Sequence, residues 1–299
     1  MESNSNDRQH LSTEMNRPPD FKEIDQFNTI KWLHLSAAIF FLVQTIIYSA
    51  VDATANVNPT IGKPTDCDGP ICFTTLKHLG EENAIFLIPL FVGLAFLDHA
   101  VSFLYCVANE DSAMKWLFQI GSNPFRWMEY SISASVMAVA IAILAGVTDV
   151  HLWTLIFVMH AVGMGFGQLI ELIPKEEVAS SAYSSSSSVS TMSPNVYVKF
   201  QTIRSLGWWL GAVSIFTPWL VIAYYFFRAV SSDVPDFVYA AFLGTLVLYI
   251  TFGVNSYLHN VLGWYSFGTA EIVYIALSFT SKTFLAADVF GGLNASSNN

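Results

Sequence analysis

The stretch Ile272-Val-Tyr-Ile-Ala-Leu-Ser-Phe-Thr-Ser-Lys282-Thr-Phe-Leu-Ala-Ala-Asp-Val-Phe290 is the last long apolar segment of the chain, and it carries one lysine. An ionisable side chain at membrane depth costs free energy, so it normally has a charged partner or a chemical role. One role that suits a buried lysine amine is condensation with an aldehyde to form a Schiff base. The stretch therefore predicts a membrane-spanning helix with a reactive lysine at Lys282.

The composition of the whole chain also indicates an integral membrane protein. Of 299 residues, 53% are hydrophobic and 12% are charged, and the mean hydropathy is +0.47. A soluble domain carries about 25% charged residues. The net charge of -10 argues against nucleic acid as a partner. Nothing indicates a soluble enzymatic domain, and we expect neither catalysis nor a metal site.

Seven apolar stretches are long enough to cross the hydrocarbon core, which takes about 20 helical residues. We expect an all-α membrane protein with one seven-helix bundle over residues 30–290, flanked by a polar N-terminal tail (1–29) and a C-terminal tail (291–299). A long first loop (52–83) and a serine-rich loop (174–204) would join helices. The expected spans are Trp32 to Val51, Ala84 to Ala108, Phe125 to Val147, Leu152 to Ile173, Leu206 to Phe227, Phe237 to Ser256 and Val261 to Phe290.

The lysines and arginines outside the spans predict the orientation, because they collect on the cytoplasmic side. Segments on the side of the N-terminus hold nine of them, and segments on the other side hold three. We therefore expect a cytoplasmic N-terminus and an extracellular C-terminus. The nine are Arg8, Arg17, Lys22, Lys31, Lys115, Arg126, Lys175, Lys199 and Arg204, and the three are Lys63, Lys77 and Arg228.

Two cysteines, Cys67 and Cys72, lie in the first loop on the expected outer face. The Asp-Gly-Pro between them favours a turn that could bring the sulfurs together, and an oxidising exterior would preserve a disulfide. Two free thiols are the alternative, and the sequence leaves both open.

The third span begins Asn123-Pro-Phe-Arg126-Trp-Met-Glu129-Tyr-Ser-Ile-Ser133. Arg126, Glu129 and Ser133 are three and four residues apart, which places them on one helix face. A protonated Schiff base in a low dielectric needs a counterion, because burial alone would drive its proton off. We expect Glu129 to be this counterion. The alternative is an interfacial ion pair between Arg126 and Glu129 with no chromophore.

Ser278 precedes Lys282 by one helical turn. Its hydroxyl can bond to the Schiff base or back to its own helix, and the second is the commoner fate of a membrane serine. The expected depths of the two residues in the membrane argue against a contact, because Glu129 is near the start of its helix and Lys282 is past the middle of its own. Long side chains lean toward the amino end of their helix, which narrows this gap.

These residues resemble the heliorhodopsin family. The resemblance rests on the Arg126-Trp-Met-Glu129-Tyr run with its following serines, on Leu277-Ser-Phe-Thr-Ser-Lys282 with Glu271 upstream, on Asp98-His99, and on the inverted orientation. It implies all-trans retinal on Lys282 and Glu129 as counterion, with Ser278 beside the linkage. It also implies a polar cavity that contains His99 and, from the first helix, His34. A homodimer formed with help from the first loop would give Cys67 and Cys72 a structural setting.

The expected function is photosensing. An outward proton pump carries a second carboxylate about three turns beyond the counterion, and that position is Ala140. We expect light to move the Schiff base from Glu129, and its proton to pass to an internal polar network. A signal to an unidentified cytoplasmic partner would follow.

A light-gated proton or cation channel is the alternative function, because ionisable groups within helices can mark an ion path. A receptor or transporter without retinal is a third. For three of the acids, Glu171, Glu271 and Asp288, we expect positions at helix ends in the headgroup region. The acids and histidine that could line a path are Asp98, His99, Glu129, Glu171, Glu271 and Asp288.

Overall fold

The computed structural model describes residues 21–50, 56–68, 71–173, 194–229 and 235–297. Within these residues seven helices are long and apolar enough to cross a membrane, which confirms the predicted all-α seven-helix bundle. They are α2 (Phe21–Ala50), α3 (Leu87–Ala108), α5 (Pro124–Leu144), α6 (Val150–Glu171), α8 (Pro194–Ala229), α9 (Asp236–Ser256) and α10 (Phe267–Ser297). The short elements are β1 (Asn56–Val57), β2 (Thr60–Asp68), β3 (Ile71–His78), β4 (Glu82–Asn83), η1 (Ala84–Phe86), α4 (Glu110–Met114), η2 (Lys115–Ile120) and η4 (Tyr257–Val261).

Three helix starts differ from the sequence prediction. Helix α2 begins at Phe21 and helix α8 at Pro194, so parts of the expected polar tail and of the expected serine-rich loop (174–204) are helical. Helix α10 begins at Phe267 and not at Val261, because η4 ends at Val261 and Gly263 takes a left-handed φ of 64° in the connection that follows. Only glycine adopts that conformation readily, so the chain turns there before α10 starts.

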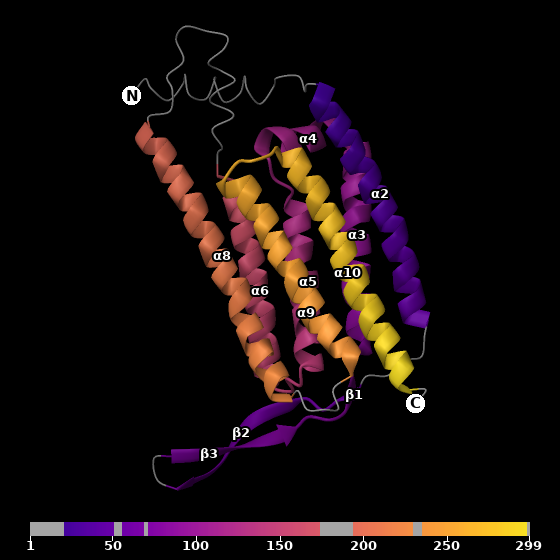
Figure 1. Ribbon diagram of the computed structural model, residues 1–299, viewed down its shortest axis with the longest axis vertical. Helices are drawn as coiled ribbons and strands as arrows, with labels where there is room; N and C mark the ends of the chain where they lie inside the picture. The colour runs from indigo at the N-terminus through magenta and orange to yellow at the C-terminus, as the bar shows by residue number, and fades with distance from the viewer. Residues whose placement is uncertain (1–20, 51–55, 69–70, 174–193, 230–234, 298–299) are drawn as a thin grey trace.

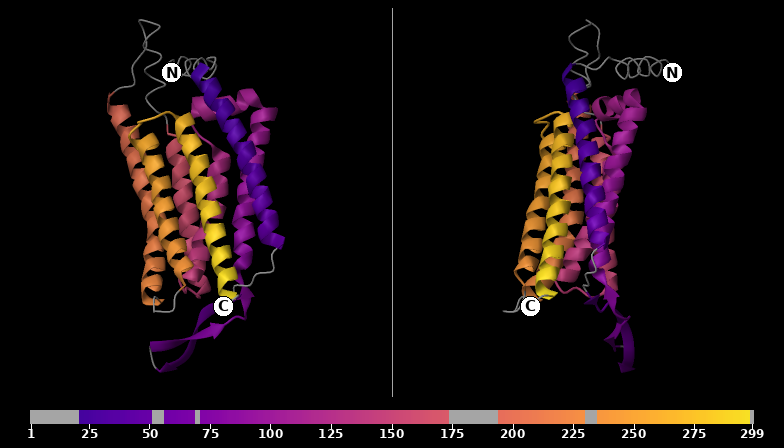
Figure 2. Two further views of the ribbon diagram at one scale, coloured as in Figure 1. Left: turned by 45° about the vertical axis from the view of Figure 1, so that its right-hand side comes forward. Right: turned by 90° about the vertical axis from the view of Figure 1, so that its right-hand side faces the viewer.

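The helices stand side by side with their axes roughly aligned (Figure 1). Contacts join α2 to α3 and α10, α3 to α5, α5 to α6, α6 to α8, and α9 to α10. The end of the bundle at which α2 begins is called the N-terminal end below. Helix α4 and π-helical turn η2 lie at this end, whereas the β2–β3 hairpin projects beyond the opposite end (Figures 1 and 2).

The hairpin occupies the long first loop. Strands β2 and β3 are antiparallel, and Thr60 N donates to Thr148 O at 2.8 Å, which ties the hairpin to the α5–α6 connection. Cys67 and Cys72 are paired positions in the backbone register. Their side chains lie outside the described part of the structure, so the disulfide stays a prediction. Most of the serine-rich loop also lies outside the described residues.

Helix α5 occupies the interior of the bundle and positions much of the site. Asn123 caps its start, because the Oδ1 atom of Asn123 accepts from Arg126 N at 3.3 Å, and Pro124 occupies the first turn. Small buried residues, among them Ser133, Ala138 and Ala142, allow neighbouring helices to approach it closely. Three of its polar residues, Arg126, Glu129 and Ser133, are buried among the other helices.

Candidate functional site

Lys282 of α10 and Glu129 of α5 form an ion pair in the interior. Lys282 Nζ lies 2.7 Å from Glu129 Oε1 and 2.9 Å from Oε2, and both side chains are buried. The later start of α10 reduces the expected difference in depth, since Lys282 lies 15 residues after Phe267. The Lys282 ammonium also lies 5.1 Å from the ring centroid of Tyr130. The two residues expected to hold and neutralise a chromophore are therefore in direct contact.

An apolar pocket of about 830 Å³, including its mouth, extends from Lys282 between α5, α6, α8 and α9. Volumes of this order hold small organic ligands. Ser133 lines the pocket, with aromatic walls from Trp127, Tyr249 and Phe252. Gly167 is required here, because a Cβ at this position would lie 2.1 Å from the Trp127 ring.

The serine predicted beside the linkage, Ser278, is buried on α10. Its hydroxyl makes no hydrogen bond to the described residues. Tyr130 donates to Tyr274 O at 3.2 Å. Ser278 lies on α10 one turn before Lys282, and therefore closer to the N-terminal end.

His34 of α2 and His99 of α3 meet in the interior, as the resemblance led us to expect. Their Nδ1 atoms are 2.8 Å apart, and both rings are 2% exposed. Asp98 Oδ2 lies 3.8 Å from His99 Nδ1. The Asp98 carboxylate interacts electrostatically with Glu129 and Lys282, so the histidine pair and the lysine–glutamate pair belong to one polar region.

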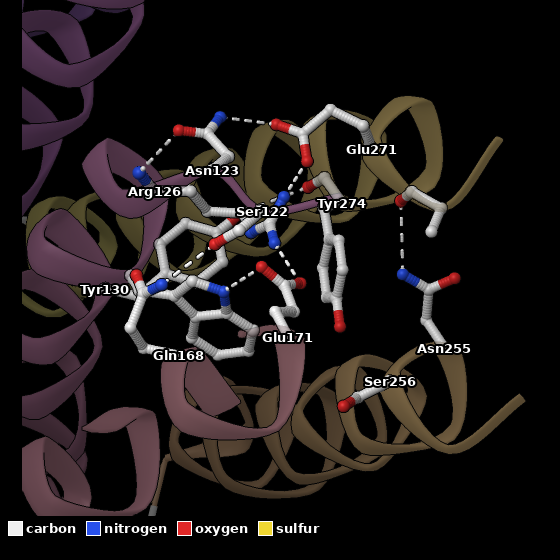
Figure 3. A network of polar contacts seen from close by, with 12 residues as sticks. Ser122, Asn123, Arg126, Tyr130, Gln168, Glu171, Asn255, Ser256, Glu271 and Tyr274 are labelled. Atoms are coloured by element: carbon white, nitrogen blue, oxygen red, sulfur yellow. Dashed lines mark hydrogen bonds and ion pairs between the residues drawn. The ribbon is translucent and has the colours of Figure 1, made fainter. Parts of the chain in front are cut away.

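A second polar cluster surrounds Arg126 at the N-terminal end (Figure 3). Arg126 Nη2 donates to Glu171 Oε1 at 2.5 Å, and Arg126 Nη1 pairs with Glu271 Oε2. The remaining oxygens accept from Trp127 Nε1 at 2.6 Å and from Asn123 Nδ2 at 2.6 Å. The cluster thus connects the ends of α5, α6 and α10.

This cluster corrects two expectations. Glu171 and Glu271 are 1% and 0% exposed, so their predicted headgroup positions are wrong. Their burial is possible because Arg126 supplies the opposite charge and neighbouring donors satisfy their oxygens. The alternative of an Arg126–Glu129 ion pair is not what the structure shows, because Arg126 pairs with Glu171 and Glu271 while Glu129 pairs with Lys282. Asp288, by contrast, is partly exposed.

Among the described residues, no group of three or more His, Cys, Asp and Glu side chains could hold a metal ion. The site consists of a buried amine with its carboxylate partner, and of two polar clusters.

Seven membrane helices around a buried lysine–carboxylate pair and an apolar pocket define a rhodopsin-type membrane protein. A model of the heliorhodopsin family matches residues 30–293, and the chain belongs to this family. The solved structure of a light-driven proton pump from Leptosphaeria maculans is similar at 12% identity, with 94% of this chain and 98% of that chain covered and a TM-score of 0.45. No curated protein matches the chain.

Membership of this family implies a retinal chromophore in an integral, multi-pass, light-sensing protein. The residues present fit that chromophore, because the reactive amine stands at the wall of an apolar pocket and faces a carboxylate. Sequence reasoning selected Lys282 and Glu129 but not the roles of Glu171 and Glu271. The signal that could have found those two is the unusual pairing of an arginine and two acids at the ends of apolar helices.

Proposed function

We propose that the protein is a photosensor that holds all-trans retinal as a Schiff base on Lys282, with Glu129 as counterion. The observation that carries this proposal is the contact of 2.7 Å between the two residues beside the apolar pocket. A buried lysine without a partner would lose its proton. The Glu129 carboxylate supplies the opposite charge that a protonated Schiff base on Lys282 needs.

Retinal would supply absorption of visible light and an isomerisation that displaces the Lys282 nitrogen. Displacement from Glu129 weakens the charge–charge interaction, which falls with distance and is strong in a low dielectric. The nitrogen then holds its proton less tightly. Ser133 and Ser278 offer hydroxyls beside the displaced group, and Asp98, His99 and His34 form the polar network that receives the proton.

The Arg126 cluster gives a route by which such a movement could reach the surface. Lys282 and Glu271 are both on α10, and Glu129 and Arg126 are both on α5. A shift of α10 relative to α5 therefore alters the Arg126–Glu271 contact at the N-terminal end. We infer that this end is cytoplasmic, from the count of nine basic residues against three, and that a signalling partner would bind there.

A light-gated proton or cation channel is the second candidate. It is favoured by Asp98, because this buried carboxylate is an ionisable group outside the chromophore pocket. The structure of the Arg126 cluster weighs against cation flow, since its two carboxylates are already bound to a fixed guanidinium. Photocurrent under voltage clamp distinguishes the two functions, because a passive channel reverses sign with the driving force and a sensor gives no current at any voltage.

The experiment that tests photosensing starts with pigment formation. Full-length protein supplied with all-trans retinal should become coloured, and Lys282→Ala should lose the visible band. Lys77→Ala, which removes an exposed lysine of the first loop, is the matched control and should keep it. A colourless wild-type protein would contradict the proposal. Homodimerisation through the first loop remains part of the proposal and is tested by the mass of the protein in nanodiscs.

A further inference from the structure

Side chains of α8 donate hydrogen bonds to the end of α9 and to the π-helical turn η4 that follows it. Gln201 Nε2 donates to Val261 O at 2.5 Å, Arg204 Nη1 to Asn260 O at 3.3 Å, and Trp208 Nε1 to Gly253 O at 3.2 Å. We call Gln201, Arg204 and Trp208 the α8 donors. Their spacing of three and four residues places them on one face of α8, which therefore faces η4.

The α8 donors satisfy backbone groups that a helix leaves open at its end. The last four carbonyl oxygens of a helix have no partner within it. Asn260 and Val261 end η4, and the chain then turns at Gly263, so their oxygens need donors from elsewhere. Arg204 is 6% exposed and Asn260 is 0% exposed, which keeps bulk water from replacing the donor. The end of η4 therefore takes hydrogen bonds from α8.

Trp208 is an α8 donor and also part of the wall of the apolar pocket. It lines the pocket from α8, whereas Lys282 lines it from α10. Its acceptor, Gly253, lines the pocket too. The Trp208 ring also packs against Tyr257, the first residue of η4, at 4.8 Å between ring centroids. A ligand that changes shape in the pocket can therefore displace a side chain that also holds η4.

A separate set of contacts attaches the end of α9 and η4 to the start of α10. Asn255 Nδ2 donates to Ala270 O at 3.2 Å, and Tyr265 OH donates to Asn255 Oδ1 at 2.5 Å. His259 of η4 lies with its Nδ1 atom 2.8 Å from Tyr265 O. These contacts do not involve α8, so η4 stays bound to α10 when the α8 donors let go. The movement that follows separates α8 from η4.

We propose that Trp208 is a positioning residue that couples the pocket to the N-terminal end of the bundle. Light changes the shape of the chromophore, the Trp208 indole is displaced from Gly253 O, and the first turns of α8 (residues 198–206) move away from η4. A neutral hydrogen bond contributes little net free energy, so this contact opens without unfolding the bundle. The coupling rests on the proposed function, because the chromophore supplies the change of shape. It goes further by naming the element that carries the signal.

Distances between spin labels test the movement in the full-length protein reconstituted with all-trans retinal. The three native cysteines are first replaced by serine. Thr202 and Leu262 are exposed neighbours of Gln201 and Val261, so Thr202→Cys, Leu262→Cys places one label on α8 and one beside η4. Leu262→Cys, Ala276→Cys is the control pair, because Ala276 is an exposed residue of α10. We expect illumination to lengthen the first distance and to leave the second unchanged.

Two substitutions separate the hydrogen bond of Trp208 from its bulk in the pocket wall. Trp208→Phe keeps an aromatic ring but cannot donate to Gly253 O, so the longer distance should be populated already in the dark. Trp209→Phe is the matched control, because Trp209 is the adjacent indole and is 57% exposed. This control should keep the dark distance of the protein with both tryptophans.

In coloured protein, an unchanged distance between the α8 label and the η4 label on illumination would overturn the coupling, and so would an equal change in the control pair. Equal dark distances in Trp208→Phe and Trp209→Phe would overturn the role of Trp208. The light-dependent distance with native Trp208 decides the matter even where Trp208→Phe does not fold. These outcomes leave photosensing intact, whereas a colourless protein would contradict the retinal linkage itself.

Discussion

Glu129 Oε1 and Lys282 Nζ lie 2.7 Å apart although their residues are separated by 153 positions in the chain. The contact depends on the late start of α10, which brings Lys282 closer in depth to the first turns of α5. Each group alone would be a costly buried charge, and together they form a neutral pair.

Glu129→Gln removes the counterion charge but keeps the size of the side chain. We expect the absorption band to move to the red, or the Schiff base to lose its proton and the band to move to the blue, because the resting charge is no longer balanced. Absorption spectra of the reconstituted variants measure this. Asp98→Asn is the comparison, and a spectrum altered there but unchanged in Glu129→Gln would assign the counterion to Asp98.

Gly167→Ala tests the apolar pocket. A Cβ at this position would lie 2.1 Å from the Trp127 ring, so the ring must move into the space assigned to retinal. We expect weaker pigment formation or a shifted band, measured by titration with retinal. Gly165→Ala is the matched control on the same helix, since its Cβ meets nothing within 4 Å. Equal behaviour of the two variants would place the chromophore elsewhere.

Arg126→Gln should destabilise the bundle, because it leaves the Glu171 and Glu271 carboxylates buried without their shared cation. Breaking a buried ion pair from one side costs about 3–5 kcal/mol. Thermal unfolding in detergent, followed by circular dichroism, measures the loss. Arg228→Gln removes an exposed arginine and should change the melting temperature little. A melting temperature equal to wild type in Arg126→Gln would mean that the cluster contributes no stability.

His99→Phe should interrupt the histidine pair while preserving the stacking position against Phe41, whose ring lies 5.6 Å from His99. We expect the visible band to form and the recovery after a flash to change in rate, because the receiving group for the proton is lost. Time-resolved absorption gives the rate. Unaltered recovery kinetics would exclude His99 from the proton network.

The sequence was sufficient to predict the seven-helix architecture and to select Lys282 and Glu129. Long apolar stretches predict seven spans because hydrocarbon leaves few other structures for the backbone. Lys282 could be selected because it is the one lysine of the last apolar stretch, and Glu129 because it is the one acid of the third. The start of α10 was missed because an apolar run continues across Gly263, and only the backbone turn interrupts it.

The roles of Glu171 and Glu271 could not be predicted, because an acid near a helix end is normally solvated. Their burial follows from contacts with Arg126, whose sequence separations from them are 45 and 145 positions.

The most direct test of the central claim is to reduce the illuminated or dark pigment with borohydride, digest it and locate the retinyl group by mass spectrometry. Reduction converts a Schiff base to a stable secondary amine, so the modified residue survives digestion. The account predicts a retinyl group on the peptide that contains Lys282. A retinyl group on another lysine, or a coloured protein without any covalent adduct, would contradict it.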